Sequence, residues 1–99
     1  MRILAVEKPV PDVPPERFTT ELSAPEARRV WELYQAGTIR EVFFRADEQA
    51  AVLMLESADI GEAQDVLATL PLVIAGLIAF EIIPLRAYPG FARLFERPT

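Results

Sequence analysis

The most constraining feature of this sequence is that its predicted strands are apolar on both faces. Residue alternation predicts strands over residues 1–8, 38–46, 50–56 and 78–86. In three of the four, both alternating sets are largely apolar, as in the run AAVLMLE at residues 50–56. An antiparallel sheet with one face in water normally alternates apolar and polar residues. This chain is therefore expected to cover both faces of its sheet.

Two helices are predicted between these strands. Ser23 and Glu26 have the spacing of a capping box, which predicts the start of the first helix, and Gly37 is suited to end it. A second helix is expected to start after Asp59 and to end at Pro71. Each helix carries an apolar stripe at intervals of three and four residues, so each is expected to pack on a sheet.

The resulting order, β-α-β-β-α-β, is the ferredoxin-like pattern. Right-handed crossovers place both helices on one face of a four-stranded antiparallel sheet. The other face would expose an apolar patch on the order of several hundred Å², which is more than a monomer usually shows. We infer a homodimer in which two sheets close face to face. The C-terminal tail is the alternative cover, either on its own sheet or across to the partner.

The fold class that follows is α+β, as a dimeric α+β barrel. Residues 1–99 are expected to form one domain, with a proline-rich loop at residues 9–15 and an amphipathic tail at residues 88–99. The longest apolar run covers residues 70–85 and contains two prolines and a glutamate. A membrane span needs about 20 apolar residues, so we expect neither a membrane segment nor a targeting segment, and a cytoplasmic location.

The amino-acid composition excludes several kinds of chemistry. The chain has no cysteine and no histidine, so it offers no thiolate nucleophile, no Ser-His dyad and no imidazole or thiolate metal site. Its net charge of −5 argues against a nucleic-acid surface. We therefore expect no metal, no cofactor and no nucleic-acid partner.

Charged residues on the otherwise apolar strands are candidates for chemistry. The charged residues on or near predicted strands are Arg40, Arg45, Glu7, Glu41, Glu56 and Glu81. They could pair at a sheet edge, or they could enter a pocket between sheet and helices. In such a pocket an arginine fixes a carboxylate, and a glutamate with a raised pKa moves a proton. Glu26 has the same two interpretations, as a helix cap or as a proton shuttle.

Four large side chains are candidates for the pocket lining. Trp31 and Tyr34 lie on the apolar stripe of the first helix, where a core role is the alternative, and Met54 could equally fill the core. Strict alternation over residues 38–46 places Phe44 on the face of Arg40, and it places Ile39 on the opposite face.

With these residues placed, the chain resembles muconolactone delta-isomerase and its relatives, within the dimeric α+β barrel superfamily. The resemblance is carried by residues 24–72. It rests on Ala24 and Glu26 near the helix start, on the pattern G-T-x-R-x(4)-R at residues 37–45, on the apolar strand at residues 52–55, and on the Leu-Pro-Leu sequence at residues 70–72.

The resemblance implies a small cofactor-free isomerase, in relatives a ring of dimers, that moves a proton and so shifts the double bond of an unsaturated lactone. Glu26 matches an acidic position of the family, and Arg40 and Arg45 match basic ones. The expected ligand is a small, anionic, mostly apolar molecule. The expected catalytic residues are Glu26 and Glu81, and the expected substrate-binding residues are Arg40, Arg45, Trp31, Tyr34, Phe44 and Met54. A non-catalytic or stress-associated ligand-binding barrel and a cofactor-free monooxygenase of the same superfamily are the alternatives.

Overall fold

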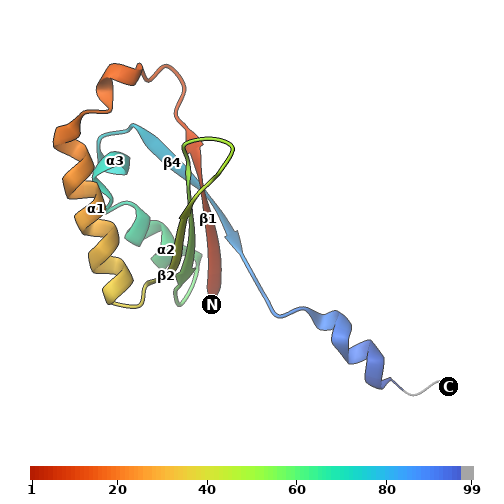
Figure 1. Ribbon diagram of the computed structural model, residues 1–99. Coiled ribbons are helices and arrows are strands. Elements are labelled where there is room, and N and C mark those ends of the chain that lie inside the picture. Colours follow the sequence, from red (N-terminus) through yellow and green to blue (C-terminus); the bar gives the residue numbers. More distant parts are fainter. Residues whose placement is uncertain (97–99) are drawn as a thin grey trace.

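The structure is a computed structural model that describes residues 1–96, and it contains the expected order of elements (Figure 1). The strands are β1 (Arg2–Pro9), β2 (Ile39–Phe44), β3 (Ala51–Glu56) and β4 (Ile78–Pro84). The helices are α1 (Thr20–Gln35), α2 (Ile60–Leu67) and α3 (Pro71–Ile74), and two short 3₁₀ segments are η1 (Pro15–Arg17) and η2 (Pro89–Phe95).

The four strands form one antiparallel sheet in the order β2-β3-β1-β4. This is the ferredoxin-like α+β fold, so the fold class predicted from the sequence is confirmed. All three α-helices lie on one side of the sheet (Figure 1). The core between the two layers is built on Ile3, Leu55 and Leu70, each with no exposed surface. Within residues 1–96, no helix has the length and apolar composition needed to cross a bilayer.

The two faces of the sheet differ in cover although both are apolar. On β1, Ile3 and Ala5 face the helices and are fully buried. Leu4 and Val6 point to the other face, which we call the open face, and they are only partly buried. The strand pairing places Met54 and Val52 beside them on the same face. No described residue of this chain forms a second layer over the open face (Figure 1).

A β-bulge changes the facing of β2. Ile39 pairs with Leu55, but Glu41 already pairs with Met54, so Arg40 is an extra residue in the strand. After the bulge, Phe44 is on the helix side together with Ile39. The prediction that Ile39 and Phe44 face opposite sides is therefore wrong, because strict alternation cannot register an inserted residue.

Helix α1 begins earlier than the capping pattern predicts. Its N-cap is Thr19, and Ser23 lies inside the helix, where its hydroxyl donates to the carbonyl of Thr20 at 2.9 Å. Pro25 is also inside the helix. The expected capping box is wrong, and the carboxylate of Glu26 does not cap α1. The end of α1 is as predicted, because Gly37 has a φ of 81° and the amide of Thr38 donates to the carbonyl of Leu33.

The second helix is split in two. The predicted cap at Asp59 is confirmed, since its carboxylate accepts from the amide of Glu62 at 2.8 Å. Helix α2 then ends at Leu67, and Pro71 starts α3 rather than simply ending the previous helix. A proline suits the first position of a helix because its φ is already helical and its missing N–H would have no partner there.

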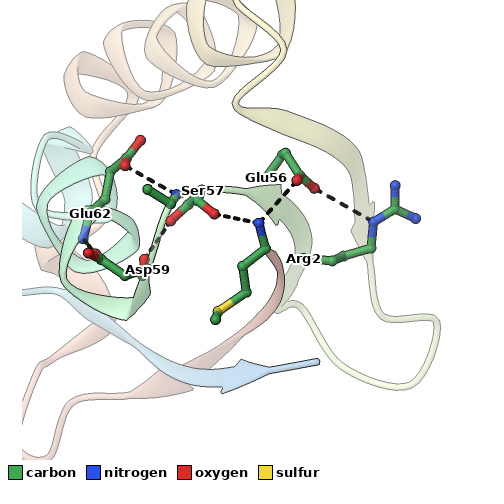
Figure 2. A network of polar contacts seen from close by, with 7 residues as sticks. Arg2, Glu56, Ser57, Asp59 and Glu62 are labelled. Carbon is green, nitrogen blue, oxygen red and sulfur yellow. Dashed lines mark hydrogen bonds and ion pairs between the residues drawn. The ribbon is translucent and has the colours of Figure 1, made fainter. Parts of the chain in front are cut away.

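A polar network holds one end of the sheet (Figure 2). The N-terminal ammonium of Met1 donates to Glu56 at 3.2 Å and to the carbonyl of Ser57 at 2.7 Å. Arg2 lies 4.0 Å from the other carboxylate oxygen of Glu56. The network joins the start of β1 to the end of β3, next to the Asp59 cap of α2. The candidate site lies at the opposite end of the sheet, where β1 ends and β4 begins.

The chain continues past the sheet as an arm, which we define as residues 85–96. It leaves the end of β4 and projects away from the domain, with η2 at its far end (Figure 1). The long dimension of the molecule is 64 Å against 28 and 23 Å in the other two directions. The expected cover of the chain's own sheet by its tail is therefore not what this structure contains. Residues 97–99 of that predicted tail lie outside the described residues.

Candidate functional site

A cavity of about 510 Å³ lies between the sheet and the segment that joins β1 to α1. It opens at the end of the sheet where β1 finishes and β4 starts. Its walls are mostly apolar and come from the ends of β1 and β2, the proline-rich loop, the residue after η1, the β2–β3 turn, α3 and the start of β4. The apolar residues include Val10, Val13, Phe18, Phe44, Leu72 and Leu77, and the polar ones are Glu7, Glu48 and Gln49.

Glu7 is the acidic residue that β1 brings into this cavity. It continues the inward-facing set of Ile3 and Ala5, and it is partly buried. Its carboxylate accepts a hydrogen bond from the amide of Ala51 at 3.1 Å. Burial raises the pKa of Glu7, the Ala51 hydrogen bond opposes that shift, and the nearby charge of Glu48 adds to it. Glu7 was one of the charged strand residues considered from the sequence but was not chosen as an expected catalytic residue, although its place in the inward alternation of β1 was a usable signal.

Glu26 reaches the same region from α1. Its carboxylate accepts from the amide of Leu72 at 2.9 Å, and Leu72 lines the cavity. Burial raises the pKa of Glu26, the bond to Leu72 lowers it, and the charge of Glu7 raises it further. The charge of Glu7 is the smallest of these three influences on the pKa of Glu26.

Glu81, the other expected catalytic residue, lies elsewhere. It pairs with Val6 on the open face of the sheet and is exposed. Within one chain, the sheet therefore separates it from Glu26 and from the cavity. The structure does not bring the two expected catalytic carboxylates together.

Neither expected arginine lines the cavity. Arg45 is held at the β2–β3 hairpin, where its guanidinium contacts Asp47 at 2.6 Å and Glu48 at 2.8 Å. It is thus one residue removed from the cavity, behind Glu48. Arg40 sits at the bulge of β2, near the other end of α1. Among the cavity-lining residues of this chain, the charged groups are acidic only.

Arg40, Trp31 and Tyr34 come together around a second, shallower hollow of about 480 Å³. The rings of Trp31 and Tyr34 are stacked, with centroids 6.0 Å apart and an angle of 24° between their planes. Both side chains are about half exposed, so neither is a core residue. This hollow shares no lining residue with the cavity. Of the four expected pocket residues, only Phe44 lines the cavity, and Met54 lies on the open face.

Two carboxyl groups with raised pKa values are available for acid–base chemistry: Glu7 lines the cavity, and Glu26 is bound to Leu72, which lines it. A carboxyl group with a raised pKa can take a proton from a bound molecule and give it back. Across residues 1–96, no three carboxylates cluster closely enough to hold a metal ion.

The chain is similar to known proteins both in sequence and in fold. The sequence model of one family, described as muconolactone delta-isomerase, matches residues 3–90. The fold is similar to the crystal structure of muconolactone isomerase, with a TM-score of 0.71 and 24% identity, over 90% of this chain and 92% of that one.

A second similar structure is 5-chloro-2-hydroxyhydroquinone dehydrochlorinase from Burkholderia phenoliruptrix AC1100, in complex with 2,5-dihydroxybenzoquinone. Its TM-score is 0.66 with 16% identity, over 91% of this chain and 98% of that one. Among curated proteins, none matches the chain significantly. At these low sequence identities, the two solved structures indicate the fold alone. The family match covers most of the chain.

Proposed function

Because this chain belongs to the muconolactone delta-isomerase family, we propose that it is a cofactor-independent isomerase that moves a proton on a small, mostly apolar molecule bound in the cavity. The observation that carries the proposal is the pair Glu7 and Glu26. Both carboxyls are partly buried beside the cavity, and burial raises the pKa of each. A carboxylate whose pKa is raised is a stronger base near neutral pH.

The proposed step needs no electron donor or acceptor. The ionised carboxylate takes a proton from the carbon next to a carbonyl group, and the electron pair moves into a dienolate. The carboxyl group, whose proton exchanges with water, then gives a proton to a carbon further along the conjugated system, so the double bond moves and the carboxylate is restored. The second carboxyl, when protonated, can donate a hydrogen bond to the dienolate oxygen. Glu7 and Glu26 divide these two roles.

The proposal includes a homodimer that closes through the open face. Leu4, Val6, Val52 and Met54 present apolar side chains there that no described part of the chain covers. A second copy offers a matching apolar sheet, and two sheets packed face to face bury both surfaces about 10 Å apart. This arrangement is the dimeric α+β barrel expected from the sequence.

The test is turnover of muconolactone, the compound in the family's name, followed by proton NMR in D₂O. We expect product formation and deuterium incorporation with the unmodified chain. Glu26→Gln and Glu7→Gln should each lower kcat by about 10²–10⁴-fold, the usual contribution of a positioned acid–base group. Asp65→Asn, an exposed position on α2, is the matched control and should leave kcat unchanged.

The same assay separates the alternatives. Loss of turnover in Glu81→Gln but not in Glu26→Gln or Glu7→Gln would move the proton shuttle to the open face. Saturable binding of muconolactone without any product would favour a ligand-binding barrel that catalyses nothing. Oxygen uptake with a quinol in place of isomerisation would favour the monooxygenase alternative.

A further inference from the structure

The polar groups that line the cavity are mainly hydrogen-bond acceptors. They are Glu7, Glu48 and Gln49, and every other lining residue is apolar. An ionised carboxylate accepts hydrogen bonds and cannot donate them. Within residues 1–96, only Oε1 of Glu7 accepts a bond, from the amide of Ala51, so Oε2 is left for a ligand. The lining therefore matches a ligand that donates hydrogen bonds, as a hydroxyl group does.

Arg45 does not make the mouth of this cavity positive. Its Nη1 lies 2.8 Å from Glu48, while its Nε and Nη2 donate to the two oxygens of Asp47 at 2.9 and 2.6 Å. The edge of the guanidinium that could hold a ligand carboxylate with two bonds is thus occupied by Asp47. One positive and two negative groups leave this hairpin with a formal net negative charge, and Glu48 is the member that lines the cavity.

Two other cations that are close in the chain are directed elsewhere. Arg17 precedes the lining residue Phe18, but its guanidinium donates to the carbonyl of Ala75 at 3.2 Å. Lys8 follows Glu7 on β1, and the alternation of the strand places it on the open face. Among the described residues, the ionisable groups that line the cavity are acidic only.

Proton transfer adds to the effect of this acidic lining. In the proposed step the ligand becomes a dienolate, so negative charge develops inside the cavity that Glu7 and Glu48 line. A neutral ligand then carries one negative charge, whereas a ligand with a carboxylate of its own carries two. Two carboxylates about 6 Å apart, in an effective dielectric of about 20, repel each other enough to weaken binding roughly 100-fold. The lining thus disfavours anionic ligands in binding and again in the transition state.

We propose that the cavity selects neutral molecules that donate hydrogen bonds, that it discriminates against carboxylates, and that Glu48 sets this preference. The side chain of Glu48 is 55% exposed, which places it at the mouth of the cavity, whereas Glu7 is partly buried. The anionic ligand expected from the sequence would need a cation that the described lining does not supply. The effect on turnover rests on the proposed function, whereas selection in binding does not.

Selection is tested by the binding of two molecules that differ in one end group. Benzyl alcohol and benzoate share a ring, but the first ends in a neutral hydroxymethyl group and the second in a carboxylate. Titration followed by ligand-observed NMR should give a Kd at least ~10-fold lower for benzyl alcohol. Glu48→Gln removes the charge and keeps the shape, so it should reduce this ratio at least ~5-fold. Asp65→Asn removes a carboxylate from the exposed face of α2 and should leave the ratio unchanged.

Glu48→Lys gives a sharper test, because a cation at the mouth should reverse the preference in favour of benzoate. The position tolerates the change, since Glu48 is exposed and Arg45 stays bonded to Asp47. Circular dichroism checks the fold of each variant. Four results would overturn the selection: no saturable binding of benzyl alcohol, equal affinity for the two molecules, tighter binding of benzoate by the unmodified chain, or an unchanged ratio in both Glu48 variants. Tighter benzoate binding that is lost in Arg17→Gln would identify Arg17 as the ligand-binding cation.

The effect on turnover is tested with muconolactone, which carries a carboxylate, and with its neutral methyl ester. We expect kcat/KM to be at least ~10-fold higher for the ester. Glu48→Gln should lower the KM for muconolactone at least ~5-fold, and Asp65→Asn should not change it. A chain that prefers benzyl alcohol but isomerises neither lactone would retain the selection and lose the proposed function. A chain that isomerises both lactones equally well would retain the proposed function and lose the selection.

Discussion

The two faces of the sheet are built from the same strands and similar residues, yet they differ in cover. Ile3, Ala5 and Leu55 meet the helices and are fully buried, whereas Leu4 and Met54, their neighbours in the chain, remain partly exposed. Burial on the first face stabilises the single chain. The second face has similar side chains but gains that stabilisation only on association. An apolar pattern thus specifies that a face must be covered, and the topology decides whether the same chain covers it.

The largest effect is expected on the helix-covered face. Leu55→Ala should lower the free energy of unfolding by about 2–5 kcal/mol, because it leaves a cavity between β3 and the helices. Ile74→Ala, an exposed aliphatic residue on α3, is the control and should change the free energy by less than about 0.5 kcal/mol. Urea unfolding monitored by circular dichroism measures both. Equal losses at the two positions would contradict the layer assignment.

The open face should respond in association rather than in folding. Val52→Glu places a carboxylate at the centre of the proposed sheet-to-sheet contact and should weaken the dimer by at least ~100-fold, because the charge would be buried unpaired. The circular dichroism spectrum should not change. Sedimentation velocity measures the mass, with Ala68→Glu on the exposed end of α2 as control. If the Val52→Glu chain sediments like the unmodified chain, the open face is not the interface between copies.

A smaller effect is expected where α1 passes into β2. Gly37 has a φ of 81°, so Gly37→Ala should cost roughly 1 kcal/mol of unfolding free energy. Gly61→Ala is the matched control, because Gly61 lies inside α2 with ordinary helical backbone. This change should leave stability unchanged or raise it. Thermal unfolding compares the two, and similar losses would show that backbone strain is not the cause.

The smallest effect concerns pH. Burial raises the pKa of Glu7 and Glu26 above the ordinary value of 4.5, so the folded state holds its protons more tightly than the unfolded chain. Stability should therefore fall as pH rises from about 4.5 to the raised folded values. Glu26→Gln keeps an acceptor for Leu72 and should flatten this slope. Urea unfolding at a series of pH values measures it, and an unchanged slope would assign the effect to other groups.

The order of the elements could be predicted because it depends on local patterns. Alternation marked the strands, Gly37 the end of α1, and Asp59 the start of α2. The candidate site was harder, because its contacts join distant segments. Glu26 accepts a hydrogen bond from the backbone of Leu72, 46 residues away. The local spacing from Ser23 instead predicted that Glu26 caps the start of its own helix. Glu7 could have been chosen over Glu81 among the charged strand residues, since it extends the buried set of β1.

The two expected arginines show a second limit of prediction from sequence. Arg40 and Arg45 fit a family pattern in sequence, but the pattern does not record what each meets in space. Arg45 is bound by two neighbouring carboxylates at its hairpin, and Arg40 is the extra residue of a bulge. Their positions depend on how the strands pair, and the periodicity of a single sequence does not determine that pairing. For the same reason Trp31 and Tyr34 form a separate hollow and do not line the cavity.

The bulge at Arg40 has a further consequence for how this protein can change. Phe44 faces the cavity because the bulge takes Arg40 out of the alternation, so that Phe44 lies opposite Ala51. If Arg40 were drawn into a regular ladder and the length of β2 kept, Phe43 would turn toward the cavity and Phe44 away from it. The same side chains can therefore line the chamber in two ways, and comparisons between relatives should track the presence of the bulge as closely as side-chain identity.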